Sequence, residues 1–143
     1  MSDRLMIEKI LRYMEDHLDQ ELTLEKIAKE FHYSKFYLTR RFKENTGVTP
    51  YKYMQGRRLD RAARKLAETS RPIVEIALEA GYHSQQAFTQ AFRGTYGQTP
   101  QEYRRTGIFI PRQNRIFMDL SGVSKSSLSW IFRLERTERR AAA

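Results

Sequence analysis

Cysteine is absent from the 143 residues of this chain, so it can form no disulfide, no thiolate metal site and no cysteine nucleophile. It also lacks any hydrophobic run near the roughly 20 residues that span a bilayer as a helix. Acidic residues interrupt the apolar positions of its first 18 residues, which is unlike a signal peptide. No nucleophile–base pair or carboxylate pair has a usable spacing for catalysis. We therefore expect a cytoplasmic protein that is not an enzyme and that holds no metal or cofactor.

Negative charge is scarce relative to positive charge. Lys and Arg number 26 against 17 Asp and Glu, which gives a net charge of +9 and a pI near 10.0. Residues 35–71 alone hold 11 basic and 3 acidic side chains, whereas residues 1–34 hold 5 basic and 8 acidic. A basic excess gathered in one segment favours a polyanionic partner, either nucleic acid or an acidic membrane surface.

The chain repeats itself about fifty residues apart. Residues 34–53 read SKFYLTRRFKENTGVTPYKY, and residues 84–103 read SQQAFTQAFRGTYGQTPQEY. The match continues upstream, from Ile27-Ala28 to Ile76-Ala77, with one extra residue in the second copy. Self-similarity at a long fixed period indicates a duplicated structural unit.

Each copy carries the signals of a short helix, a tight turn and a second helix. Alanine in the first helix allows the close approach that a helix-turn-helix requires. A serine cap and a terminal glycine bound the second helix, over about residues 34–45 and 84–96. The first helix of the second copy carries the apolar residues Ile73, Ile76, Ala77 and Leu78.

The sequence thus predicts an all-α fold of seven helices, with no convincing strand before Gly107. Thr49-Pro50 starts a long helix that should run to about Glu68. The tail after residue 107 is basic and unlike the rest, and the sequence does not decide its structure. The expected organisation is a helix-turn-helix subdomain at residues 1–49, a linker helix at 50–69, a second such subdomain at 70–107 and a C-terminal tail at 108–143.

The outward face of each second helix carries side chains suited to DNA. A major groove admits one helix, and its base edges are read by arginine at guanine, glutamine at adenine and apolar contact at the thymine methyl group. Arg40 is the guanine candidate, and Gln85 and Gln86 are the adenine candidates. The residues predicted to read bases are Lys35, Phe36, Thr39, Arg40, Gln85, Gln86, Thr89 and Gln90.

Contacts to the DNA backbone are expected at the helix starts, where capped turns present free N–H groups, a turn beyond the base-reading residues, and on the linker helix. The predicted residues are Ser34, Lys43, Arg57, Ser84 and Arg93. The linker arginines, Arg57 among them, can equally be solvated, paired in salt bridges or bound to phosphate. The sequence alone does not divide these roles among Arg57, Arg58, Arg61 and Arg64.

A regular linker helix would be about 28 Å long at 1.5 Å per residue. This is close to the roughly 34 Å between successive major-groove faces. One monomer could therefore occupy two adjacent grooves of double-stranded DNA. Because the two outward faces differ in composition, the site should consist of two unlike boxes and not of a palindrome.

The paired units resemble the DNA-binding domain of the AraC/XylS family of bacterial transcription regulators, and most of all its small MarA/SoxS/Rob group. The resemblance rests on two ordered motifs, Ser34 to Gly47 and Ser84 to Gly97, and covers about residues 3–105. It implies two recognition helices joined by a rigid linker, promoter binding, and recruitment of RNA polymerase to activate transcription.

The chain departs from the usual pattern of that group at several places. Phe36 and Gln90 stand where the group commonly has tryptophan and arginine, which changes the expected target sequence but not the binding mode. His32 replaces the usual turn glycine, and histidine tolerates a left-handed turn better than branched residues do. Gln55-Gly56 interrupt a start of the linker helix that is usually rich in arginine.

Two functions are open at this point. The first is a monomeric, ligand-independent transcription activator that acts on the nucleoid. The second is an interaction module whose basic surface or tail binds a protein or a membrane, with only non-specific DNA affinity. Within the tail, residues 115–120 could form a strand and residues 127–139 an amphipathic helix, or the tail could be disordered or non-native. Specific binding that survives loss of residues 108–143 would favour the first function.

Overall fold

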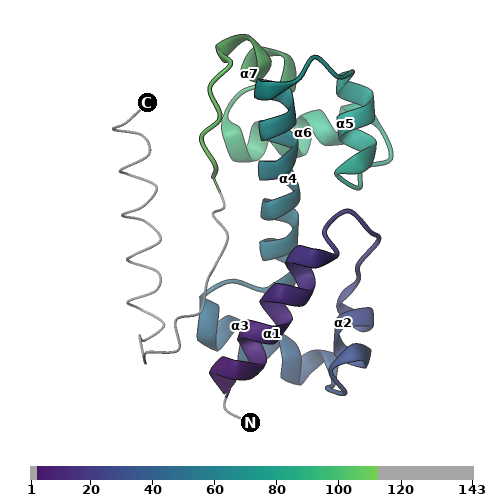
Figure 1. The fold of residues 1–143 in the computed structure, drawn as a ribbon, viewed down its shortest axis with the longest axis vertical. Coiled ribbons are helices and arrows are strands. Elements are labelled where there is room, and N and C mark those ends of the chain that lie inside the picture. Colours follow the sequence, from purple (N-terminus) through teal and green to yellow (C-terminus); the bar gives the residue numbers. More distant parts are fainter. Residues whose placement is uncertain (1–2, 113–143) are drawn as a thin grey trace.

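The computed structural model describes residues 3–112, and these form seven helices and no strand, as predicted (Figure 1). The strand and helix expected within the tail lie outside the described residues. No helix within residues 3–112 is both long and apolar enough to cross a bilayer. The helices are α1 (Asp3–Asp16), α2 (Leu24–Glu30), α3 (Lys35–Thr46), α4 (Pro50–Glu68), α5 (Ile73–Glu79), α6 (Gln85–Tyr96) and α7 (Pro100–Thr106).

Local caps explain most of the helix starts. Five helices follow a serine or threonine whose side-chain oxygen accepts a hydrogen bond from the N–H three residues later, at 3.1 or 3.2 Å. Proline then occupies the first position of α4 and of α7. α5 follows Pro72 without a side-chain cap. The five caps are Thr23, Ser34, Thr49, Ser84 and Thr99.

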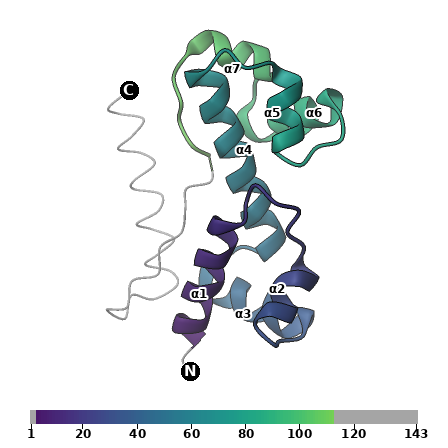
Figure 2. The same cartoon turned by 45° about the vertical axis from the view of Figure 1, so that its right-hand side comes forward.

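Two separate cores lie at the two ends of α4. The first joins α1, α2 and α3 to the start of α4, up to Met54, and the second joins the rest of α4, from Leu59, to α5, α6 and α7. Figures 1 and 2 show the two groups of helices at opposite ends of α4 in both views. Because α4 supplies side chains to both cores, it holds the two helix-turn-helix units in one arrangement.

The α5 helix buries only some of its apolar residues. Ile76 and Ala77 are buried in the second core, whereas Leu78 is 57% exposed. The helical period explains the difference, because a residue two positions after Ile76 points about 200° away from it.

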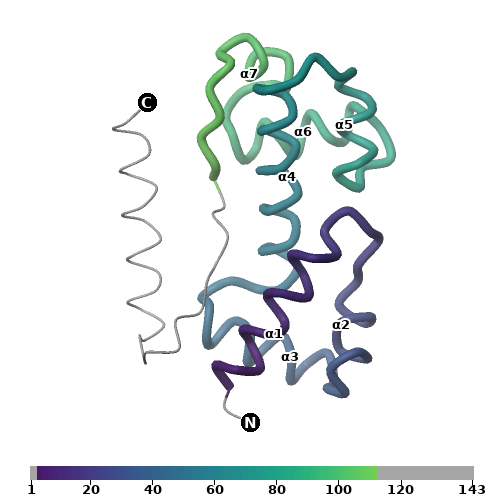
Figure 3. Tube along the Cα trace, viewed as in Figure 1, coloured from purple at the N-terminus to yellow at the C-terminus, as the bar shows by residue number. Residues whose placement is uncertain are grey.

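The first residues after α7 pack against the fold. Residues 107–112 run beside α4 (Figure 3), and Phe109 packs on the second core. The N–H of Ile110 donates to the Tyr103 hydroxyl at 2.9 Å. The N–H of Arg112 donates to Asp60 Oδ1 at 3.0 Å, and Asp60 is only 1% exposed. The beginning of the predicted tail therefore contributes to the second core.

Candidate nucleic-acid interface

α3 and α6, the second helices of the two repeats, each bury one face and expose the other. Leu38 and Phe42 of α3 are fully buried in the first core, and Phe88 and Phe92 of α6 hold the equivalent positions in the second. Both helices start at a capping serine and end at a glycine with positive φ, so they have the same length and phase. The helical period then sets which positions point outward.

The eight residues predicted to read bases lie on these outward faces. Six are exposed and the two threonines are half-buried, and the exposure class is the same at equivalent positions of the two helices. Phe36 is 88% exposed, the most exposed large hydrophobic side chain among residues 3–112. The structure groups Lys35, Phe36, Thr39 and Arg40 on α3, and Gln85, Gln86, Thr89 and Gln90 on α6.

Four of the five residues predicted to contact the DNA backbone are exposed near these faces. Ser34 and Ser84 cap the starts of α3 and α6, where the first turn of a helix presents free N–H groups. Lys43 and Arg93 lie in the last turns of the same helices and are exposed. Each helix therefore offers backbone donors at one end and a cation at the other.

The turn that precedes α3 keeps its shape without glycine. His32 has a φ of 61°, in the left-handed region, and Gly81 at the equivalent place before α6 has a φ of 93°. The following residue closes each turn in the same way: Tyr33 N–H donates to Ala28 at 2.9 Å, and the equivalent bond in the second turn is 3.1 Å. The expectation that histidine accepts this turn is confirmed.

Lys35 has a neighbour that the sequence analysis did not find. Its ammonium lies 3.1 Å from a carboxylate oxygen of Glu25 on α2, and both side chains are more than half exposed. A hydrogen bond from the backbone and the charge of Lys35 lower the pKa of Glu25. The equivalent positions in the second unit hold Val74 and Gln85, which carry no charge. Among residues 3–112, α3 therefore has an ion pair at the start of its outward face and α6 has none.

Arg57, the fifth predicted backbone contact, lies between α1 and α4. Its Nη2 donates to Glu15 Oε1 at 2.8 Å, its Nη1 lies 3.6 Å from Asp60, and its side chain is only 16% exposed. Burial alone would lower the pKa of Arg57, but the hydrogen bond and charge of Glu15 outweigh it and raise that pKa. The structure thus places Arg57 in the salt bridge that the sequence left open as an alternative.

The other linker arginines differ from one another in their contacts. Arg58 donates from Nε and Nη2 to the backbone carbonyls of the α1–α2 loop. Arg64 pairs with Glu68 at 3.2 Å and lies over the ring of Phe109. Arg61 is exposed and forms no ion pair within residues 3–112. The spacing of arginines along the linker does not reveal the partners of Arg57 and Arg58, because these come from α1 and from the α1–α2 loop.

Known proteins share this arrangement. A family model described as a helix-turn-helix domain matches residues 27–106, which run from α2 to the end of α7. Regulatory protein SoxS of Salmonella typhimurium is 41% identical over 104 residues, 73% of this chain and 97% of that protein. Right origin-binding protein of Escherichia coli is 45% identical over 106 residues, 74% of this chain but 37% of that protein.

A solved structure decides the family. A transcriptional regulator with an AraC-type DNA-binding domain, from Chromobacterium violaceum, matches with a TM-score of 0.64 and 34% identity, over 68% of this chain and 88% of that one. This chain belongs to the AraC family. As an AraC-family protein of the SoxS and Rob type, it is a sequence-specific DNA-binding transcription regulator. The expectation that it is not an enzyme is confirmed by its membership of this family.

Proposed function

We propose that this AraC-family regulator binds, as a monomer, an asymmetric promoter site of two unlike boxes. α3 would enter one major groove and α6 the next, and the bound protein would activate transcription by recruiting RNA polymerase. It would act on the nucleoid in the cytoplasm. The single observation that carries the proposal is that α3 and α6 expose equivalent positions with unlike side chains.

The chemistry of each outward face favours a different box. On α3, Arg40 suits the two acceptors of guanine, and the ring of Phe36 suits a thymine methyl group. On α6, Gln85 and Gln86 each offer the donor and acceptor pair that matches adenine. A monomer with two unlike faces has no two-fold axis, so its site should not be palindromic.

The linker supports simultaneous use of both faces. α4 has 19 residues, which corresponds to about 28 Å at 1.5 Å per residue. Successive major-groove faces are about 34 Å apart. The remaining difference can be met by the tilt of the helices or by bending the DNA toward the protein.

The proposed backbone contacts position the two helices. The N–H groups that follow Ser34 and Ser84 would face phosphate oxygens, and Lys43 and Arg93 would add charge further along each helix. Arg57 is not among these contacts, because Glu15 and Asp60 engage it inside the protein. Recruitment of RNA polymerase is proposed from the resemblance of both motifs to the MarA/SoxS/Rob group.

Selection of bound duplexes from a random pool, at near-physiological salt, tests the mode of binding. We expect an asymmetric motif with two boxes about one helical turn apart, and a complex of one protein per duplex in native mass spectrometry. A palindromic motif bound by two copies would contradict the monomer. Binding without an enriched motif, fading as salt rises, would mean attraction to the backbone alone and would favour the interaction-module alternative. Transcription in vitro from a promoter with the selected site tests activation separately.

A further inference from the structure

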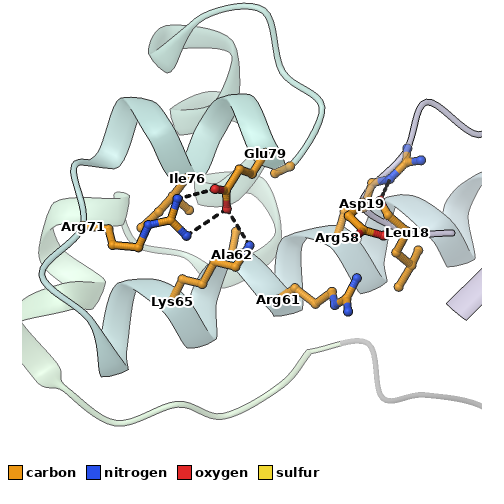
Figure 4. Close-up of a pocket in the computed structure, with 10 residues that line it drawn as sticks. Leu18, Asp19, Arg58, Arg61, Ala62, Lys65, Arg71, Ile76 and Glu79 are labelled. Carbon is orange, nitrogen blue, oxygen red and sulfur yellow. Dashed lines mark hydrogen bonds and ion pairs between the residues drawn. The ribbon is translucent and has the colours of Figure 1, made fainter. Parts of the chain in front are cut away.

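A cleft of about 440 Å³ lies between the two helix-turn-helix units, on one side of α4 (Figure 4). The α1–α2 loop forms one wall with Leu18 and Asp19, and α5 forms the opposite wall with Ile76 and Glu79. We call this space the interdomain cleft. It is not part of the outward faces of α3 and α6, because it contains none of the residues expected to read bases.

Positive charge dominates the interdomain cleft. Four cationic side chains line it against the carboxylates of Asp19 and Glu79. Glu79 is already occupied, since Lys65 donates to it at 2.7 Å and Arg71 donates to both of its oxygens. These bonds, that of Arg71 first, lower the pKa of Glu79 to about 2, so Glu79 stays ionised. Arg71 also lies 3.7 Å from Glu75, so the cluster on the α5 side of the cleft pairs two cations with two carboxylates, and its charges balance.

The other two cations, Arg58 and Arg61, have no carboxylate partner within residues 3–112. Arg58 is half-buried, and its Nε and Nη2 donate to the backbone carbonyls of Leu18 and Gln20 at 3.1 and 3.0 Å. Burial without a counter-ion lowers the pKa of Arg58. Arg61 lies three positions later on the same face of α4 and extends along the cleft in Figure 4. Asp19 forms no ion pair with either arginine.

We propose that the interdomain cleft is an oxyanion site that takes a phosphate group between Arg58 and Arg61. A guanidinium presents its donors in a planar fork that matches phosphate oxygens, and a half-buried position strengthens the attraction. Leu18 and Ile76, both buried, add apolar lining to the cleft beside this group. The phosphate belongs either to the DNA backbone between the two boxes or to a small molecule free in solution.

An occupant of this cleft touches both units at once. One wall comes from the loop that leads into α2, and the other comes from the helix that packs on α6. A bound phosphate would therefore favour one relative placement of α3 and α6. Recognition of two boxes depends on that placement. This consequence, and the DNA source of the phosphate, rest on the proposed function, whereas binding of a free phosphate does not.

Substitution of Arg61 tests the site, with Arg64 as a matched control. R61Q and R64Q each remove one exposed positive charge from α4, but Arg64 does not line the cleft and pairs with Glu68. Thermal unfolding without DNA is measured in inorganic phosphate and in chloride of equal ionic strength. If the source is a free molecule, phosphate raises the Tm of the wild type and of R64Q in a saturable way. R61Q should then require at least tenfold more phosphate for the same rise.

The second arm measures affinity for duplex DNA as a function of salt. If the source is the DNA backbone, R61Q weakens binding to all sequences alike and lowers the salt slope by about one, whereas R64Q keeps the wild-type slope. The proposal is overturned if R61Q matches the wild type in both arms, or if R61Q and R64Q change equally. Failure of the two-box motif in the wild type would contradict the proposed function, yet the arm without DNA would still decide whether the cleft binds phosphate.

Discussion

The guanidinium of Arg57 on α4 donates to the carboxylate of Glu15 on α1 at 2.8 Å, across 42 positions of the chain. Both side chains are largely buried, at 16% and 10% exposure. The pair ties the first helix of the protein to the middle of the linker, close to where the first core gives way to the second. It therefore contributes to the direction in which α4 leaves the first unit.

Removing one member of this pair should destabilise the protein strongly. E15A leaves the buried Arg57 charge without its main partner, and we expect a loss of about 3 kcal/mol in the free energy of unfolding. The matched control is E68A, which breaks the exposed pair with Arg64 and should cost less than about 1 kcal/mol. Urea denaturation measures both. Equal losses would show that burial does not strengthen the pair with Arg57.

Substitutions on the outward faces should each affect one box. R40A should relax base preference in the box read by α3, and Q85A should relax it in the box read by α6, at about 1–3 kcal/mol of discrimination each. K43A should instead weaken binding to all DNA sequences alike and reduce the dependence of log affinity on log salt concentration by about one. Repeating the duplex selection with each variant checks this. A variant that alters both boxes would contradict separate recognition.

Substitutions of Gly81 and His32, the left-handed residues of the two turns, should change stability in opposite directions. G81A places a side chain at a φ of 93°, where a Cβ meets no atom within 4 Å, so only conformational strain opposes it, at about 1 kcal/mol. H32G relieves the same strain at a φ of 61°, but the gain is smaller because glycine is more flexible in the unfolded chain. Denaturant unfolding shows whether each variant has a higher or a lower free energy of unfolding than the wild type. Stabilisation by G81A would contradict this account.

Glu79 should contribute to stability in a pH-dependent way. Its pKa falls from 4.5 to about 2 in the folded protein, mainly through Arg71 and then Lys65. Because the folded value is the lower one, the contribution is complete above about pH 5 and is lost as the pH falls from 4.5 toward 2.

The variant E79Q isolates this effect from the other carboxylates. It should be less stable than the wild type at pH 6, by no more than about 1 kcal/mol because the group is exposed. The difference should shrink toward pH 2 and in high salt. Denaturation at a series of pH values measures it, and a difference that stays constant down to pH 2 would argue against an ionic cause.

Two truncated chains distinguish the role of residues 113–143 from that of residues 108–112, which pack on the second core. A chain ending at Arg112 should keep specific DNA binding, because it retains every residue of both outward faces. A chain ending at Gly107 loses Phe109 and the hydrogen bonds to Tyr103 and Asp60, which should cost about 2 kcal/mol in stability. Binding assays and thermal unfolding of both chains test this. Loss of specificity in the longer chain would assign a recognition role to residues 113–143.

Local signals in the sequence were enough to predict most of the architecture. The duplicated Ser, Thr-Pro and Gly positions mark where helices begin and end, because caps and left-handed glycines act on their own neighbours in the chain. The helical period then separates Leu38 and Phe42 from Phe36 and Arg40, since it depends only on spacing. The sequence did not say which apolar residues of α5 are buried, because only packing shows that Leu78 lies outside the narrow buried face of this helix.

The sequence by itself determined seven helices, two repeated units and which side chains their second helices turn outward. Only the tertiary structure decided the roles of Arg57, Arg58, Arg61 and Arg64, which look alike along the linker. The partners of Arg57 and Arg58 lie on α1 and on the α1–α2 loop, whereas Arg64 pairs with Glu68 on α4 and lies over the ring of Phe109 beside it. A guanidinium is paired, desolvated or free according to the element packed against it, and that element comes from as far as 42 positions away in the chain.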